Sequence, residues 1–356
     1  MRMYGQTWDE LGTTPPARAW QMLRSLRHEP PGWAKRGARK VMFGAALEQS
    51  EQLFSAARSV TPAASPLLLF YGLSQAGRAV AAAAAGRENA DRWRLSGHGI
   101  TNSNAAGIQP SSLATLTVQN QGSGSFTQLA DILGAASLPT PVAIGDIWCL
   151  LPESAYFPLP GMGSARPRHL QHRSHGIRDE RKLLASIHVP TEMLERPGSP
   201  DPLDAIWGFE QPRAAVKEHL AQFPSLKGFD FTTPEGQRIE IRGHNATTTE
   251  IVIQWEKPAG RSDQDELLRH CVGYRSAHLT FPIIGTDERS PHPFLLWWAI
   301  LFALSKLARY EPSMWANTIS VNLSPAAAAI EHILRESIYV LPELIHRTIF
   351  EVANDR

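Results

Sequence analysis

Two long apolar segments dominate the pattern of hydrophobic and polar positions, one near each end of the chain. Residues 67–85 and 294–308 are almost uninterrupted runs of apolar side chains. A helix that is apolar on every face is buried, so both runs predict core helices. Residues 40–59 predict a third helix with one apolar stripe, which includes Phe43 and Phe54, and one polar stripe.

The starts of two helices are marked by the same dipeptide. Ser65-Pro66 and Ser324-Pro325 each place a serine before a proline, and this order is typical of an N-cap followed by the first helical residue. Gly86 predicts the end of the first of these helices. We expect the second helix to continue to Val352.

The middle of the chain has shorter apolar segments with alternating positions. We expect strands over 113–119, 142–150, 238–242, 250–255 and 274–284, and a short helix over 126–133. The pattern predicts an α+β fold, with a helical core formed by both ends of the chain and a β-rich insertion. The predicted parts are an N-terminal helical part (1–95), the insertion (96–288) and a C-terminal helical part (289–356).

Composition and charge narrow the function classes only slightly. The chain has 356 residues, of which 43% are hydrophobic and 19% charged, and its formal net charge is +1. Such a balance produces no global field that would attract nucleic acid or a membrane. Two cysteines, Cys149 and Cys271, cannot form a disulfide framework. With no signal-peptide pattern and no apolar run of about 20 residues, we expect a cytoplasmic protein without a membrane anchor.

A short frame occurs in both apolar segments. Residues 72–78 and 303–309 read small-Leu-Ser-polar-x-small-Arg, which places Ser74 near Arg78 and Ser305 near Arg309 on a helix face. Two guanidinium groups that face a shared pocket would bind a phosphate or carboxylate. The alternative is that both arginines reach solvent or pair with acidic side chains.

His98 is a second candidate because it lies between Gly97 and Gly99. Flanking glycines let a ring approach a ligand closely, and imidazole titrates near neutral pH. A loop histidine bonded to a carbonyl is the structural alternative. Together the candidate ligand-binding residues are Arg78, Arg309, His98, Ser74 and Ser305. Ser74 also resembles a variant nucleophile elbow of serine hydrolases, although its predicted position within a helix opposes that function.

Residues 166–182 form a local basic patch. It contains Arg166, Arg168, His172, Arg173 and His175, and two Arg–His spacings in it resemble those of HEPN-type ribonucleases. These residues are therefore the alternative, nucleic-acid-binding candidates, and a solvated basic loop is the plain interpretation. His169, His172 and His175 recur every third residue, but no thiol or carboxylate accompanies them, so we predict no metal site.

Several motifs in order resemble the YaaC-like proteins of bacteria. They are residues 67–79, Gly97-His98-Gly99, Gly124-Ser125-Phe126, residues 304–312 with Trp315, and Leu341-Pro342. The resemblance extends over most of the chain and implies a cytosolic bacterial protein, but no particular reaction.

These observations leave three functional hypotheses. The first is a binding or regulatory protein for a small anionic ligand such as a nucleotide, acting without a cofactor. The second is an RNA-cleaving enzyme that uses the basic patch, and the third is a serine hydrolase that uses Ser74. The sequence does not decide whether the protein is an enzyme.

Overall fold

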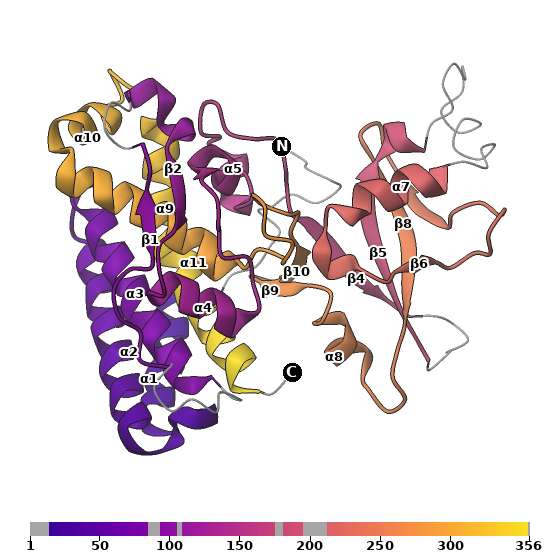
Figure 1. Cartoon of the computed structure of the whole chain (residues 1–356), viewed down its shortest axis with the longest axis horizontal. Coiled ribbons are helices and arrows are strands. Elements are labelled where there is room, and N and C mark those ends of the chain that lie inside the picture. The colour runs from indigo at the N-terminus through magenta and orange to yellow at the C-terminus, as the bar shows by residue number, and fades with distance from the viewer. Residues whose placement is uncertain (1–13, 85–92, 105–108, 175–180, 195–211, 355–356) are drawn as a thin grey trace. The chain divides into compact units, whose positions relative to one another are not determined.

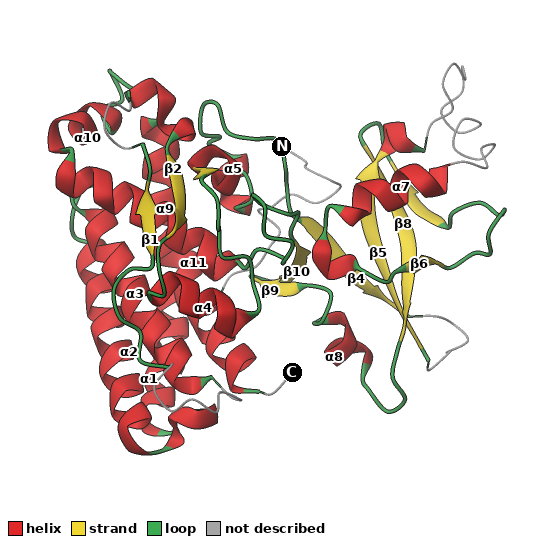
Figure 2. Ribbon diagram, viewed as in Figure 1, coloured by secondary structure: helices red, strands yellow, loops and turns green. Residues whose placement is uncertain are grey.

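The chain folds into two compact units, which we call the helical unit and the β unit. The computed structural model describes residues 14–84, 93–104, 109–174, 181–194 and 212–354. Residues 12–166 and 284–356 belong to the helical unit, and residues 167–283 belong to the β unit. Helices predominate in the first and strands in the second (Figure 2). The predicted α+β class is therefore confirmed.

The helical unit combines both ends of the chain (Figure 1). Its α-helices are α1 (Pro16–His28), α2 (Gly37–Ala57), α3 (Ser65–Ala83), α4 (Ser125–Leu133), α5 (Ile144–Trp148), α9 (Pro293–Tyr310), α10 (Pro312–Thr318) and α11 (Ala327–Ala353). Its 3-10 turns are η2 (Gly32–Lys35), η3 (Pro110–Thr115) and η4 (Pro152–Ala155). Among the described residues, no helix is long and apolar enough to cross a membrane.

Helix α3 lies at the centre of this unit and contacts α2, α9 and α11. Its glycines allow the close approach. A Cβ on Gly72 would lie 2.8 Å from the Phe54 ring, and one on Gly77 would lie 2.7 Å from the Trp298 ring. Helix α9 is buried from Pro293 to Ser305, as expected for a helix that is apolar on every face.

Helices α3 and α9 run antiparallel. The rings of Phe70 and Phe302 are 5.5 Å apart, whereas Gly77, later in α3, meets Trp298, earlier in α9. The contacts thus run toward the C-terminus of α3 and toward the N-terminus of α9. This direction separates the two arginines of the repeated frame, because Arg78 and Arg309 lie toward opposite ends of the pair.

A three-stranded antiparallel sheet accompanies these helices. Its strands are β1 (Ile100–Asn102), β2 (Thr117–Asn120) and β3 (Val142–Ala143), in the order β1-β2-β3. The predicted strand over 142–150 is wrong beyond Ala143, because the chain turns into α5. Ile144, Ile147 and Trp148 are all buried at helical spacing, and periodicity alone cannot classify so short an apolar run. The predicted strand over 113–119 likewise begins as η3.

The two Ser-Pro pairs begin their helices differently from the prediction. Ser65 is already the first residue of α3, and Ala64 occupies the N-cap position without a side-chain cap. Ser324 lies further from the helix and accepts a hydrogen bond from the Ala326 amide at 3.1 Å. Neither serine is therefore the N-cap residue of its helix.

The β unit is built on one antiparallel sheet with the order β6-β8-β5-β4-β10-β9, and β7 also pairs with β8. The strands are β4 (Arg168–Arg173), β5 (Lys182–Pro190), β6 (Asp230–Phe231), β7 (Ile241–His244), β8 (Thr248–Glu256), β9 (Val272–Tyr274) and β10 (Ala277–Thr280). The helical elements are η5 (Thr191–Met193), α7 (Pro212–Ala221), η6 (Pro224–Leu226) and α8 (Asp263–Leu267). Leu183, Ile187 and Ile253 face a core that includes Val216 of α7.

The unit boundary differs from the predicted start of the insertion at residue 96. Residues 96–166 belong to the helical unit, and only 167–283 form the inserted body. The reason is that α4 packs on α3 and α9, and α5 packs on α9. Short strands in a predominantly helical segment do not by themselves mark a separate domain.

Candidate functional site

A pocket of about 200 Å³ opens in the helical unit beside the C-terminal half of α9. We call it the His98 pocket. Helix α9 contributes Phe302, Ser305, Lys306, Arg309 and Tyr310, and the remaining wall consists of Phe70, His98, Gly99, Ile100, Thr101 and Gln121. Three of the five residues predicted to bind a ligand, namely His98, Ser305 and Arg309, therefore share one cavity.

Arg309 is held in place by two tyrosines. Its Nη1 donates to the Tyr71 hydroxyl and its Nη2 to the Tyr310 hydroxyl. Its guanidinium carbon also lies 6.0 Å from the Tyr71 ring centroid and 4.6 Å from that of Tyr310. These hydrogen bonds, first of all the one to Tyr310, raise the pKa of Arg309 above its ordinary value. The side chain is thus an oriented and permanent cation.

His98 packs its ring against an aromatic cluster at the same pocket. The ring centroid is 5.4 Å from that of Phe70 and 5.9 Å from that of Phe302. Partial burial lowers the pKa of His98 below its usual range, and the positive charges of Arg309, Lys306 and Arg78 lower it further. The environment therefore favours the neutral imidazole in the free protein, and a nearby negative charge would raise this pKa.

The main chain around His98 is fixed by the start of α4. The Phe126 amide donates to the His98 carbonyl at 3.0 Å, and the Ser125 hydroxyl donates to the Gly97 carbonyl at 2.6 Å. Gly99 has a φ of +71°, and a Cβ on it would lie 2.6 Å from the Gly124 carbonyl carbon. This contact joins two of the motifs that carry the family resemblance, and it sets the direction in which His98 projects.

Lys306 is the second basic residue of the pocket. Its Nζ lies 5.7 Å from the Phe302 ring centroid. Lys306 and Arg309 are three residues apart on α9, so they occupy neighbouring positions on one helix face. No carboxylate lines the pocket among the described residues, and no described acid forms an ion pair with either side chain. The site therefore concentrates positive charge.

Ser305 forms a hydrogen bond within its own helix, and Ser74 and Arg78 of the other frame do not line the His98 pocket. The Ser305 hydroxyl donates to the Phe302 carbonyl at 2.8 Å. Arg78 donates to Gln75 Oε1 at 3.1 Å and lines a separate, mainly apolar depression of about 470 Å³. Ser74 lies in the middle of α3 and is partly buried. A nucleophile elbow needs a strand-to-helix turn, and α3 has none at this position.

We compared the sequence with models of known protein families, with curated proteins and with solved structures. The sequence model of the family described as YaaC-like Protein matches residues 17–349. The chain belongs to the YaaC-like family. The resemblance seen in the ordered motifs is thereby confirmed. Neither the curated proteins nor the solved structures contain a significant match to the chain.

The basic patch of this YaaC-like chain is distributed over two units. Arg166 belongs to the helical unit and donates to the carbonyls of Gly163 and Ala165 at 2.9 and 2.8 Å. Arg168, His172 and Arg173 lie on β4, and His175 lies outside the described residues. A HEPN motif requires the start of a helix, whereas the described part of this patch forms a strand.

The side chains of the patch on β4 contact neighbouring groups of the β unit. Arg168 is 6% exposed, and its Nη2 lies 3.3 Å from His219 Nε2. His172 Nε2 lies 3.1 Å from an Asp263 carboxylate oxygen, and Arg173 forms an ion pair with Glu250. Each of these contacts occupies a group that would otherwise meet a phosphate. RNA cleavage stays a prediction without structural support.

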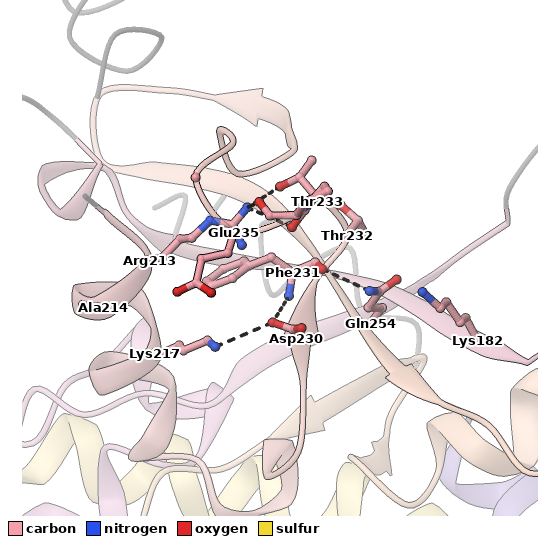
Figure 3. A pocket seen from close by; sticks show the side chains of 12 residues that line it. Lys182, Arg213, Ala214, Lys217, Asp230, Phe231, Thr232, Thr233, Glu235 and Gln254 are labelled. Atoms are coloured by element: carbon pink, nitrogen blue, oxygen red, sulfur yellow. Dashed lines mark hydrogen bonds and ion pairs between the residues drawn. The ribbon is translucent and has the colours of Figure 1, made fainter. Parts of the chain in front are cut away.

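A larger hollow of about 700 Å³ lies on the β unit of this YaaC-like chain, between α7 and the segment after β6 (Figure 3). Arg213 lies over the Phe231 ring and donates to the Thr233 and Pro234 carbonyls at 2.9 and 2.7 Å. Lys217 pairs with Asp230 at 3.6 Å. Acidic and basic groups both line this hollow, so its charge is mixed.

Sequence reasoning missed three residues of the candidate site. Lys306, Tyr71 and Tyr310 belong to the site, yet none of them was a candidate. Lys306 fills the polar position of the repeated frame, which was a usable signal. Among the described residues, no group of three or more His, Cys, Asp or Glu side chains could hold a metal ion.

Proposed function

We propose that this chain binds a small anionic ligand in the His98 pocket and acts as a binding or regulatory protein. The observation that carries the proposal is the state of Arg309. Two phenol oxygens hold its guanidinium in position, and no described carboxylate neutralises it. Arginine is well suited to bind phosphate or carboxylate because it presents several donors in one plane.

The hydrogen-bonding capacity of Arg309 leaves room for a ligand. A guanidinium has five N–H donors, and the two tyrosine hydroxyls accept from two of its nitrogens. A phenol accepts these bonds without cancelling the positive charge, as a carboxylate would. The tyrosines therefore reduce the entropy that Arg309 would lose on binding and leave its attraction for an anion intact.

The size of the pocket supports a small ligand, or the anionic end of a larger one. Pockets for drug-sized molecules measure about 300–1,000 Å³, and the His98 pocket has about 200 Å³. We further propose that the protein acts in the cytoplasm of a bacterium. This is consistent with two buried cysteines that are not joined in a disulfide, since a reducing compartment keeps cysteines in the thiol form.

A thermal-shift screen tests the proposal. Phosphate, acetate, citrate and small phosphometabolites are added singly at constant ionic strength. We expect a subset to raise the melting temperature of the wild type and to have no effect on Arg309→Gln. Arg18→Gln, an exposed arginine of α1, is the control for charge loss. A wild type that responds to no anion, or responds equally in Arg309→Gln, would overturn the proposal.

A further inference from the structure

Charged and neutral hydrogen-bond donors surround the His98 pocket. Lys306 and Arg309 provide two fixed positive charges, and His98 can become the third on protonation. Thr101 and Gln121 line the same pocket and carry neutral hydrogen-bonding groups. Donors thus come from three separate parts of the chain, namely α9, the loop at His98, and the β1–β2 sheet with its following residue.

We infer that the ligand enters this pocket with a phosphoryl group, which binds between Lys306 and Arg309 with His98 as an additional donor. The inference rests on the proposed function and specifies the ligand class. A phosphate monoester has a charge of about −1.5 to −2 at pH 7 and three strong acceptor oxygens. A carboxylate has one charge and two oxygens, and would leave part of this donor set without a partner.

The volume agrees with this assignment. The pocket of about 200 Å³ equals the volume of roughly six or seven liquid waters at about 30 Å³ each. That space admits a tetrahedral group and a few further atoms. The organic part of a phosphate monoester would extend beyond the cavity, where Tyr310, which is 60% exposed, borders the opening.

The charged groups around His98 also favour a multiply charged anion. Arg78 on α3 and Lys306 and Arg309 on α9 all lower the pKa of His98. The acid of the adjacent α4, Asp131, pairs with Arg289 at 3.5 Å instead. A dianion would offset this excess of positive charge more completely than a monoanion and would stabilise the imidazolium form.

Phenyl phosphate and benzoate form a matched pair of probes, because they share a ring and differ in the anionic group. Calorimetric titration of the full chain at pH 7 and constant ionic strength should show phenyl phosphate binding at least tenfold more tightly than benzoate. Inorganic phosphate and acetate are compared in the same way. The variant Lys306→Gln should bind phenyl phosphate about 10- to 100-fold more weakly and should lose most of the preference over benzoate.

The control is Lys40→Gln, which removes the same charge from an exposed position on α2 and should bind like the wild type. Circular dichroism melting shows whether Lys306→Gln remains folded, and Lys306→Arg, which keeps the positive charge, should lose less affinity for phenyl phosphate than Lys306→Gln does. A benzoate affinity within tenfold of that of phenyl phosphate would refute the phosphoryl assignment while the proposed function stands. Absence of binding by all four probes would refute both.

Discussion

Arg309 on α9 donates a hydrogen bond to the hydroxyl of Tyr71 on α3, and these two helices come from opposite ends of the sequence. The bond links the two halves of the helical unit at the edge of the candidate site. A cation at such a position usually has an acidic partner. Here its partners are neutral, so the contact orients the charge and leaves it available to a ligand.

The first prediction concerns this contact. Tyr71→Phe removes one acceptor from Arg309 while keeping the ring that packs beside His98. A hydrogen bond to a charged group contributes about 1.5–3 kcal/mol, but the second tyrosine still holds Arg309. Only part of this loss should therefore reach the ligand, and we expect phenyl phosphate to bind about 2- to 10-fold more weakly. Calorimetry measures the affinity, and thermal melting should change little. Tyr339→Phe, on the exposed side of α11, is the matched control. An unchanged affinity in Tyr71→Phe would show that the tyrosine does not position Arg309.

The second prediction concerns the contact between Gly99 and Gly124. A Cβ on Gly124 would lie 2.4 Å from the Gly99 nitrogen, so Gly124→Ala forces the loop at His98 away from α4. We expect a loss of at least about 2 kcal/mol in unfolding free energy, together with weaker anion binding. Urea denaturation followed by circular dichroism measures the loss.

Gly97→Ala is the comparison for this variant. Gly97 also has a positive φ, of +61°, but no atom lies within 4 Å of the added Cβ. Gly97→Ala should lower the unfolding free energy only through the strain of a positive φ at alanine, by about 1–2 kcal/mol. Equal losses in the two variants would indicate that the backbone approach at Gly124 has no importance of its own.

The third prediction concerns the pH dependence of binding. In the free protein, burial and three nearby cations hold the pKa of His98 below 6.5. A bound anion raises this pKa, so the complex binds more protons than the free protein does. Affinity should therefore increase as the pH falls through the window between the two pKa values, by at most about tenfold per pH unit for one proton.

Sulfate is the suitable probe for this measurement, because it keeps its charge throughout the range. Calorimetric titrations between pH 5.5 and 8 should give an affinity that rises toward acid pH in the wild type. In His98→Gln the affinity for sulfate should not change with pH over this range. The same slope in both proteins would assign the coupled proton to another group.

The fourth prediction concerns the β unit. Burial, with a further contribution from the charge of Arg168, lowers the pKa of His219 to about 4. Burial likewise lowers that of His169 to about 4. In the unfolded chain both should titrate near 6.5, so between pH 6.5 and 4 the unfolded state binds more protons. Stability should consequently be complete above pH 6.5 and should decrease toward pH 4, by at most about 1.4 kcal/mol per pH unit for each histidine.

Proton NMR of the imidazole resonances tests this directly. The His219 signal, assigned by its absence in His219→Gln, should titrate near pH 4 in the folded protein. In the same variant the dependence of unfolding free energy on pH should become shallower. A His219 ring that titrates near 6.5 would contradict the prediction.

The core helices could be predicted from the sequence because their signal is strong and local. The apolar run at 67–85 corresponds to α3, which ends at Ala83, and the run at 294–308 corresponds to α9. The secondary structure of residues 142–150 could not be predicted, because a strand of two residues is followed there directly by a short helix. Local patterns also could not show that 96–166 packs with the helices, because that depends on contacts distant in sequence.

The candidate site was only partly accessible to sequence reasoning. His98, Ser305 and Arg309 were candidates and line one pocket, whereas Arg78 was a candidate and lines another depression. The difference arises from the antiparallel packing of α3 and α9, a direction that the repeated frame does not encode. Lys306 was not a candidate, although it fills the polar position of the repeated frame, and the structure identifies it because it lines the same pocket as Arg309 and His98.

The insertion of residues 167–283 between the two parts of the helical unit has a consequence for the chain during its synthesis. The loop at His98 and Tyr71 emerge from the ribosome early, but Lys306, Arg309 and Tyr310 are added only after the whole β unit has been translated. A truncated product that ends within the β unit has half of the pocket and none of its fixed cations. Ligand binding would thus require synthesis to proceed at least through Tyr310, and a ligand that stabilises the fold would act only on chains that have reached this length.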